Sequence, residues 1–195
     1  MTIEFLKKAE NTPKTGEDDT RRIVSEMLAE IEVGGEDKVR EYSAELDEYK
    51  GNTVVTSEEI TAASLKLSQK LKDDIRFAYD RVRTFAEHQR ESMTEFESEI
   101  APELFCGQRL IPVETAGCYV PGGRYAHVAS AIMSVTTAKV AGVKNIVACA
   151  PPKKNEGVNY AILYTLDLCG ADTILAVGGV QGVAAMAFGL FTGNP

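Results

Sequence analysis

The sequence predicts an α/β protein in which a helical N-terminal region precedes a parallel β-sheet, and two observations carry this prediction. Charge is uneven: the first hundred of the 195 residues hold 24 Asp and Glu against 15 Lys and Arg, whereas the remainder holds 5 against 6. From Thr115 onward, short apolar strand-like segments alternate with helical segments. Alternation of this kind is typical of parallel strands joined by right-handed crossovers.

Two amphipathic helices are expected within the first fifty residues. The first runs from Glu17 to about Val33, where Gly34-Gly35 ends it, and the second follows directly. Their apolar residues recur at helical spacing among charged ones. These residues are Ile23, Met27, Leu28 and Ile31 in the first helix, and Val39, Tyr42 and Leu46 in the second.

Two further helices complete the helical region. Thr56-Ser-Glu-Glu59 has the spacing of a capping box and predicts the start of a third helix. A fourth helix runs on to about Ser92. The expected apolar faces are Ile60, Ala63, Leu67 and Leu71 for the third helix, and Ile75, Ala78, Val82 and Phe85 for the fourth.

Near Glu95 the charge thins and β-like segments begin. Strands are expected at residues 96–100, 104–110, 113–120, 145–149 and 173–177, and helices at residues 128–141, 156–168 and 181–190. The apolar segments Ile146-Val-Ala-Cys149 and Ile174-Leu-Ala-Val177 suit burial on both faces of a sheet, as parallel strands require.

Composition excludes several classes of function. The net charge is −8 and no basic patch is present, so nucleic acid is not an expected partner. The N-terminus holds no apolar segment long enough for a signal peptide or a membrane span, which favours a soluble, cytoplasmic protein. The four cysteines form no C-x-x-C pair, and we expect Cys149 and Cys169 to be small buried hydrophobic residues rather than nucleophiles.

Two glycine-rich loops are the candidates for ligand binding. Tyr119-Val-Pro-Gly-Gly-Arg-Tyr-Ala-His127 and Gly178-Gly-Val-Gln-Gly182 each lie between a predicted strand and a predicted helix. In open parallel sheets, ligands bind at this end of the strands, and the helix N-termini offer free N–H groups to phosphate. Neither loop is a G-x-G-x-x-G or Walker A motif, so the glycines could equally well make only tight turns.

Individual side chains in these loops suggest contacts with a ligand. Tyr119 could stack on a nucleotide or be a half-buried packing residue, and Gln181 could offer its amide to a ribose or a base, or lie at the surface as a cap. Arg124 and His127 would favour an anionic group, although a lone histidine is more often structural or solvated.

The string Glu114-Thr-Ala-Gly-Cys-Tyr-Val-Pro-Gly-Gly123 resembles the histidinol dehydrogenase family. Three further blocks follow in family order: Thr137-Ala-Lys-Val-Ala-Gly-Val143, Cys149-Ala-Pro-Pro152 and Val177-Gly-Gly-Val-Gln181. The resemblance implies a zinc-dependent enzyme that oxidises an alcohol through an aldehyde to a carboxylate with NAD, and that is a homodimer when intact. It also implies that Tyr119 and Gln181 contact NAD.

The residues after the Pro-Gly-Gly turn differ from those of histidinol-oxidising members. Those enzymes continue Arg-Ala-Pro-Leu, whereas this chain has Arg124-Tyr-Ala-His127. This variant resembles the sulfopropanediol dehydrogenase branch, which oxidises 2,3-dihydroxypropane-1-sulfonate to sulfolactate. A sulfonate needs hydrogen-bond donors, so His127 is the expected substrate-binding residue. Oxidation of histidinol to histidine is the alternative function.

The resemblance implies a truncated aldehyde/histidinol-dehydrogenase-like fold with an incomplete Rossmann-like sheet. Residues 1–108 are expected to form the helical region and the start of a first α/β domain, and residues 109–195 a truncated NAD-binding domain. The family's zinc ligands and catalytic Glu-His pair are expected beyond Pro195, so residues 1–195 alone should be inactive. A non-catalytic nucleotide-binding module is the remaining alternative.

Overall fold

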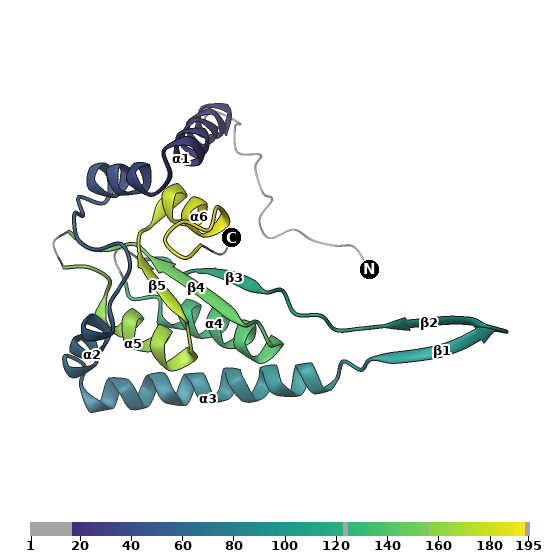
Figure 1. Ribbon diagram of the computed structural model, residues 1–195. Helices are drawn as coiled ribbons and strands as arrows, with labels where there is room; N and C mark the ends of the chain where they lie inside the picture. The colour runs from purple at the N-terminus through teal and green to yellow at the C-terminus, as the bar shows by residue number, and fades with distance from the viewer. Residues whose placement is uncertain (1–16, 123–124, 155, 194–195) are drawn as a thin grey trace, which may run out of the picture.

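The computed structural model describes residues 17–122, 125–154 and 156–193. It has the mixed α/β architecture that the sequence predicts, with a three-stranded parallel sheet at its centre (Figure 1). The strands are β3 (Thr115–Tyr119), β4 (Asn145–Ala150) and β5 (Thr173–Ala176), in the spatial order β3-β4-β5. The described elements thus confirm the alternation from which the fold class was predicted.

The two faces of the sheet are covered by different helices (Figure 1). Helices α4 (Val128–Ala141) and α5 (Tyr160–Cys169) pack on one face, and α6 (Gly179–Ala187) packs on the other. Side chains alternate along the strands as a pleated sheet requires: Ile146 and Ala148 point to α4 and α5, whereas Val147 and Cys149 point to α6. Burial of both faces explains why these strands are almost entirely apolar.

The N-terminal helices form outer layers around this sheet. Helix α1 (Glu17–Leu46) lies against α6, α2 (Ser57–Leu65) lies against α5, and α3 (Gln69–Glu91) lies along α4 (Figure 1). Ala63 of α2 and Ile75 of α3 belong to the same buried cluster as the sheet residues. The helical region and the sheet therefore share a core, and the proposed domain boundary near residue 108 stays a prediction.

Several predicted helix ends are confirmed and others are wrong. Gly35 breaks α1 with φ 59° and ψ −142°, which gives the two helical pieces that the Gly34-Gly35 pair predicts. The capping box at Thr56 and Glu59 is also present. The third helix, however, ends at Leu65 and does not reach Leu71, because Ser68 caps a new helix by accepting a hydrogen bond from the Leu71 amide.

The helix expected at residues 156–168 begins later, at Tyr160. The Asn159 side chain caps it by accepting a hydrogen bond from the Ala161 amide at 2.9 Å. Lys153 and Gly157 are joined by backbone hydrogen bonds in a tight turn that precedes this cap. Helix α6 begins two residues earlier than expected, at Gly179.

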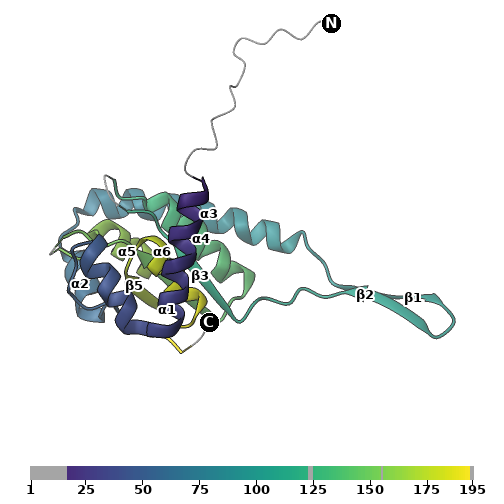
Figure 2. The ribbon, with the colours of Figure 1, turned by 90° about the horizontal axis from the view of Figure 1, so that it is seen from above.

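A β-hairpin projects away from the body of the protein (Figures 1 and 2). It consists of β1 (Phe96–Ala101) and β2 (Leu104–Gln108), which pair antiparallel, and every residue in both strands is exposed. Among the described residues, no helix is both long and apolar enough to cross a membrane.

Candidate functional site

The carboxyl ends of the three parallel strands meet at one edge of the sheet, as the glycine-rich loops predict. Tyr119 ends β3, Pro151 follows β4, and Gly178 follows β5. Pro151 packs between the two glycine-rich loops. A Cβ atom added to Gly122 would lie 2.7 Å from Pro151 Cγ, and one added to Gly178 would lie 2.5 Å from Pro151 Cβ. Glycine is therefore needed at both positions to let the loops approach this proline.

Tyr119 joins the first loop to the start of α6. Its hydroxyl oxygen accepts a hydrogen bond from the Gly179 backbone N–H at 3.2 Å. The side chain is 37% exposed, so part of the ring remains open to a ligand. The structure thus brings Tyr119 and the Gly178–Gly182 loop together, while its predicted contact with NAD stays a prediction.

Gln181 lies in the first turn of α6 and is only 1% exposed, so it is neither a surface residue nor a solvent-facing cap. Its Nε2 donates a hydrogen bond to Asp47 Oδ2 at 3.1 Å. Its Oε1 is buried and has no hydrogen-bond partner among the described residues. Because a buried acceptor without a partner costs free energy, this oxygen is a candidate for contact with a ligand.

Asp47 is a site residue that the sequence analysis missed. It follows α1 and is half-buried beside Gln181. Burial raises the pKa of the Asp47 carboxyl, and hydrogen bonds from Gln181 and the Gly178 backbone oppose this rise. No sequence signal separates Asp47 from the 23 other acidic residues of the first hundred, because its burial depends on a contact with a residue 134 positions away.

His127 immediately precedes α4 and is exposed. It makes no side-chain capping bond to the helix, so its ring is available at the helix N-terminus, where the backbone dipole favours an anion. Arg124, the other cationic candidate in this loop, lies outside the described residues. The role of His127 in substrate binding stays a prediction.

The buried cysteines are unsuited to nucleophilic chemistry. Cys118, Cys149 and Cys169 are buried, which confirms the prediction for the last two. Burial, together with the nearby Cys118, raises the pKa of the Cys149 thiol to about 12. Among the described residues, no group of three His, Cys, Asp or Glu side chains is placed to hold a metal ion.

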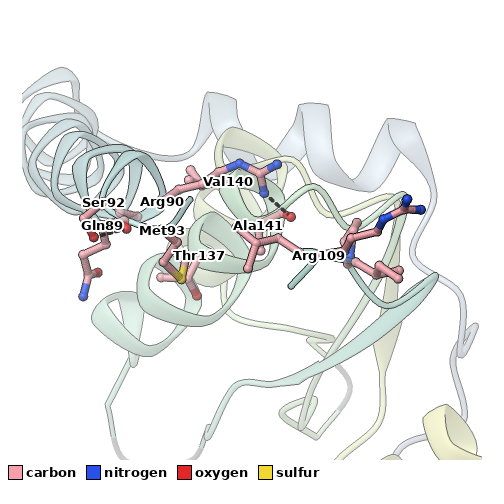
Figure 3. Close-up of a pocket in the computed structure, with 12 residues that line it drawn as sticks. Gln89, Arg90, Ser92, Met93, Arg109, Thr137, Val140 and Ala141 are labelled. Carbon is pink, nitrogen blue, oxygen red and sulfur yellow. Dashed lines mark hydrogen bonds between the residues drawn. The ribbon is translucent and has the colours of Figure 1, made fainter. Parts of the chain in front are cut away.

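A cavity of about 660 Å³ lies away from these loops, between the end of α3, the segment before β3 and the end of α4 (Figure 3). Arg90 and Arg109 line it together with apolar side chains such as Ile111 and Val140. Arg90 is held in place by a hydrogen bond that it donates to the Ala141 carbonyl (Figure 3). The cavity contains none of the predicted ligand-binding residues.

Comparison with known proteins gives a consistent set of similarities. The family described as "Histidinol dehydrogenase" matches residues 10–195. The chain is 56% identical over 191 residues to a protein named sulfopropanediol 3-dehydrogenase from Ruegeria pomeroyi, covering 98% of this chain and 44% of that protein. It is 52% identical over 196 residues to a histidinol dehydrogenase homolog from Pelagibacter ubique, covering 100% of this chain and 46% of that protein.

A solved structure supports the same relationship. The crystal structure of histidinol dehydrogenase from Elizabethkingia anophelis superposes with a TM-score of 0.83 at 30% identity, covering 96% of this chain and 41% of that one. The chain therefore spans less than half the length of the relatives that it matches.

Proposed function

Since the chain belongs to the histidinol dehydrogenase family, we propose that it is the NAD-binding part of a dehydrogenase that oxidises an alcohol through an aldehyde to a carboxylate. One observation carries this proposal. Two glycine-rich loops meet at the carboxyl edge of the parallel sheet, where the Tyr119 hydroxyl accepts a hydrogen bond from Gly179 and a buried Gln181 follows. Ligands of open parallel sheets bind at this edge.

The residues at this edge fit a dinucleotide. Tyr119 offers an aromatic ring that is part exposed, and Gln181 offers a buried amide oxygen without a partner among the described residues. Close packing of Gly122 and Gly178 on Pro151 gives the loops a fixed backbone. In the proposal Tyr119 and Gln181 hold NAD, which supplies the acceptor for the hydride removed from the alcohol.

We propose 2,3-dihydroxypropane-1-sulfonate as the substrate, which the intact enzyme would convert to sulfolactate. Identity to the sulfopropanediol 3-dehydrogenase is 56%, against 39% to a histidinol dehydrogenase from Methanococcus maripaludis and 30% to the histidinol dehydrogenase of known structure. The exposed His127 supports the same substrate, because its ring N–H can donate to a sulfonate at the start of α4. Histidinol, which is a cation, would gain nothing from such a donor and is the alternative substrate.

Zinc and a homodimeric state also belong to the proposal. The described residues hold no group of three potential metal ligands, so they do not fit a zinc site. We place the zinc ligands and the catalytic acid–base residues in the part of the protein that corresponds to the rest of its relatives. The exposed apolar residues of the β1–β2 hairpin, such as Phe96, Ile100 and Phe105, are compatible with an interface in a dimer.

The test is a comparison of substrates with the full-length protein. NADH formation is measured with 2,3-dihydroxypropane-1-sulfonate and with L-histidinol as the alcohol. We expect kcat/KM for the sulfonate diol to exceed that for histidinol by about 100-fold or more, because binding of an anion and of a cation require opposite charges. A preference for histidinol would support the alternative substrate. Absence of turnover with either alcohol, combined with measurable NAD binding, would support a non-catalytic nucleotide-binding module.

A further inference from the structure

The contact between Asp47 and Gln181 links the N-terminal helices to the loop after β5. Asp47 lies just beyond the end of α1, and its Oδ2 accepts a hydrogen bond from Gln181 Nε2 at 3.1 Å. The two residues are 134 positions apart in the chain, and Gln181 is 1% exposed. Asp47 is half-buried, so the contact is partly shielded from solvent.

The contact with Asp47 fixes the orientation of the Gln181 side-chain amide, because it engages the Nε2 end and leaves the Oε1 end without a bond to Asp47. An ionised carboxylate can only accept hydrogen bonds, whereas a glutamine amide has a donor end, Nε2, and an acceptor end, Oε1. With the amide turned the other way, Oε1 would face the Asp47 carboxylate and the two oxygens would repel each other. Asp47 therefore holds Gln181 with one of its two N–H donors occupied and its acceptor left over.

The acceptor end is the one that lacks a partner. Gln181 Oε1 is buried and has no hydrogen-bond partner among the described residues. It lies beside the side-chain position of Gly179, since a Cβ atom added there would be 2.9 Å from Oε1. Gly179 is exposed and has φ 55°, and as a glycine it places no side chain of its own over this oxygen.

Building on the proposed NAD site, we propose that Asp47 is a positioning residue that makes Gln181 present a hydrogen-bond acceptor to the cofactor. The part of NAD bound at this loop is then a hydrogen-bond donor, such as a ribose hydroxyl or an amide N–H. A phosphate, which has only acceptor oxygens at neutral pH, does not fit. The Asp47 carboxylate also repels a second negative charge near Gln181, which offsets the attraction of the α6 N-terminus for an anion.

Exchange of the two functional groups tests this inference in the full-length protein. In Asp47→Asn, the new amide can either accept from Gln181 Nε2 or donate to Gln181 Oε1, so Gln181 is no longer held with its acceptor directed away from residue 47. We expect the Kd for NAD, measured by calorimetry, to rise about 10-fold. In Gln181→Glu, two carboxylates face each other and NAD binding should weaken at least as much.

The double variant Asp47→Asn/Gln181→Glu restores one hydrogen bond between the two side chains, with the donor now at position 47 and the acceptor at position 181. The introduced asparagine amide donates to the introduced glutamate, whose second carboxylate oxygen is left as the acceptor. The affinity for NAD should therefore return to within about 3-fold of the unmodified protein, a coupling that independent sites would not show. A residue that acted on NAD binding independently of Gln181 would not give recovery in NAD affinity on this exchange.

Two controls make the outcome decisive. Glu45→Gln removes a charge from an exposed residue near the end of α1 and should leave the Kd for NAD unchanged. Thermal unfolding of Asp47→Asn should show no loss of Tm, because burial of the Asp47 carboxylate is unfavourable. Unchanged NAD affinity in Asp47→Asn, or a double variant as weak as Gln181→Glu alone, would overturn the inference. Failure of the unmodified protein to bind NAD would instead overturn the proposed function.

Discussion

A buried amide, Gln181, and a buried thiol, Cys149, lie at the carboxyl edge of the sheet, and they differ in whether they can take part in binding or chemistry. Gln181 keeps a buried oxygen without a partner among the described residues, whereas Cys149 is held as a neutral thiol with its pKa raised to about 12. The first can be satisfied by a ligand. The second is protonated and enclosed, which removes it from nucleophilic chemistry at neutral pH.

The burial of three cysteines predicts selective alkylation. At pH 8 the native chain should react with iodoacetamide at Cys106, which is exposed on β2. Cys118, Cys149 and Cys169 should react only slowly, because burial both encloses these thiols and raises their pKa values, so that their reactive thiolate forms are rare. Mass spectrometry of peptides counts the labelled sites, with urea-unfolded chain as the control in which all four react. Rapid labelling of a second thiol in the native chain would contradict the described packing.

Charge reversal at His127 tests the substrate proposal at the level of one residue. In the full-length protein, His127→Glu places a carboxylate where the proposal places a sulfonate, so kcat/KM for the sulfonate diol should fall about 10-fold or more. Oxidation of histidinol should be affected much less. His88→Glu is the matched control, because His88 is exposed on α3. Equal losses with both alcohols would remove the reason for preferring the sulfonate.

Residues of the site differ in how far the sequence reveals them. Tyr119 and Gln181 stand in glycine-rich motifs at strand ends, so their meeting at one edge follows from the rules of parallel sheets. The burial of Gln181 could not be predicted, because a helix N-terminus is usually solvated. Asp47 lies in an acidic region and gains its role from a contact that only the folded chain creates.

At the scale of elements, the three loops after β3, β4 and β5 are held together by close contacts with Pro151. Replacement of Gly178 by alanine should lower the unfolding free energy by about 1–3 kcal/mol, because the new methyl group overpacks a rigid ring. Its Cβ would lie 2.5 Å from Pro151 Cβ. The measurement is urea unfolding followed by circular dichroism.

Gly117 provides the control for this substitution. A Cβ atom at Gly117 would lie 3.2 Å from Met186 Sδ, and the flexible methionine side chain can move away. Gly117→Ala should therefore destabilise the protein less than Gly178→Ala. Equal urea midpoints for Gly178→Ala and the unmodified protein would show that a methyl group fits between residue 178 and Pro151, contrary to the close contact in the structure.

Apolar spacing predicts the presence and type of most elements, but it does not set their ends. The apolar positions Leu67 and Leu71 continue the period of the third helix, yet Ser68 caps a new helix between them. In the same way Asn159 delays the start of α5 to Tyr160. Side-chain caps compete locally with helix continuation, and the outcome depends on tertiary packing that periodicity does not report.

At the scale of the whole molecule, the N-terminal helices complete the α/β core and also reach the candidate site. Helix α1 packs on α6, and the residue just after α1 contacts Gln181 (Figure 1). The sequence predicts a helical region there, but amphipathic patterns do not say which partner each face will meet. The projecting β1–β2 hairpin is likewise predicted as strands, while its position away from the sheet is a result of the fold (Figure 2).

We propose above all that the edge formed by Tyr119 and Gln181 binds NAD. The most direct test is calorimetric titration of NAD into the full-length protein, with Gln181→Ala compared with Gln69→Ala, a control at an exposed glutamine of α3. We predict saturable binding by the unmodified protein and by the control, and a Kd about 10-fold higher for Gln181→Ala, because a buried hydrogen bond to the cofactor is lost. Identical affinities in all three proteins would contradict the claim.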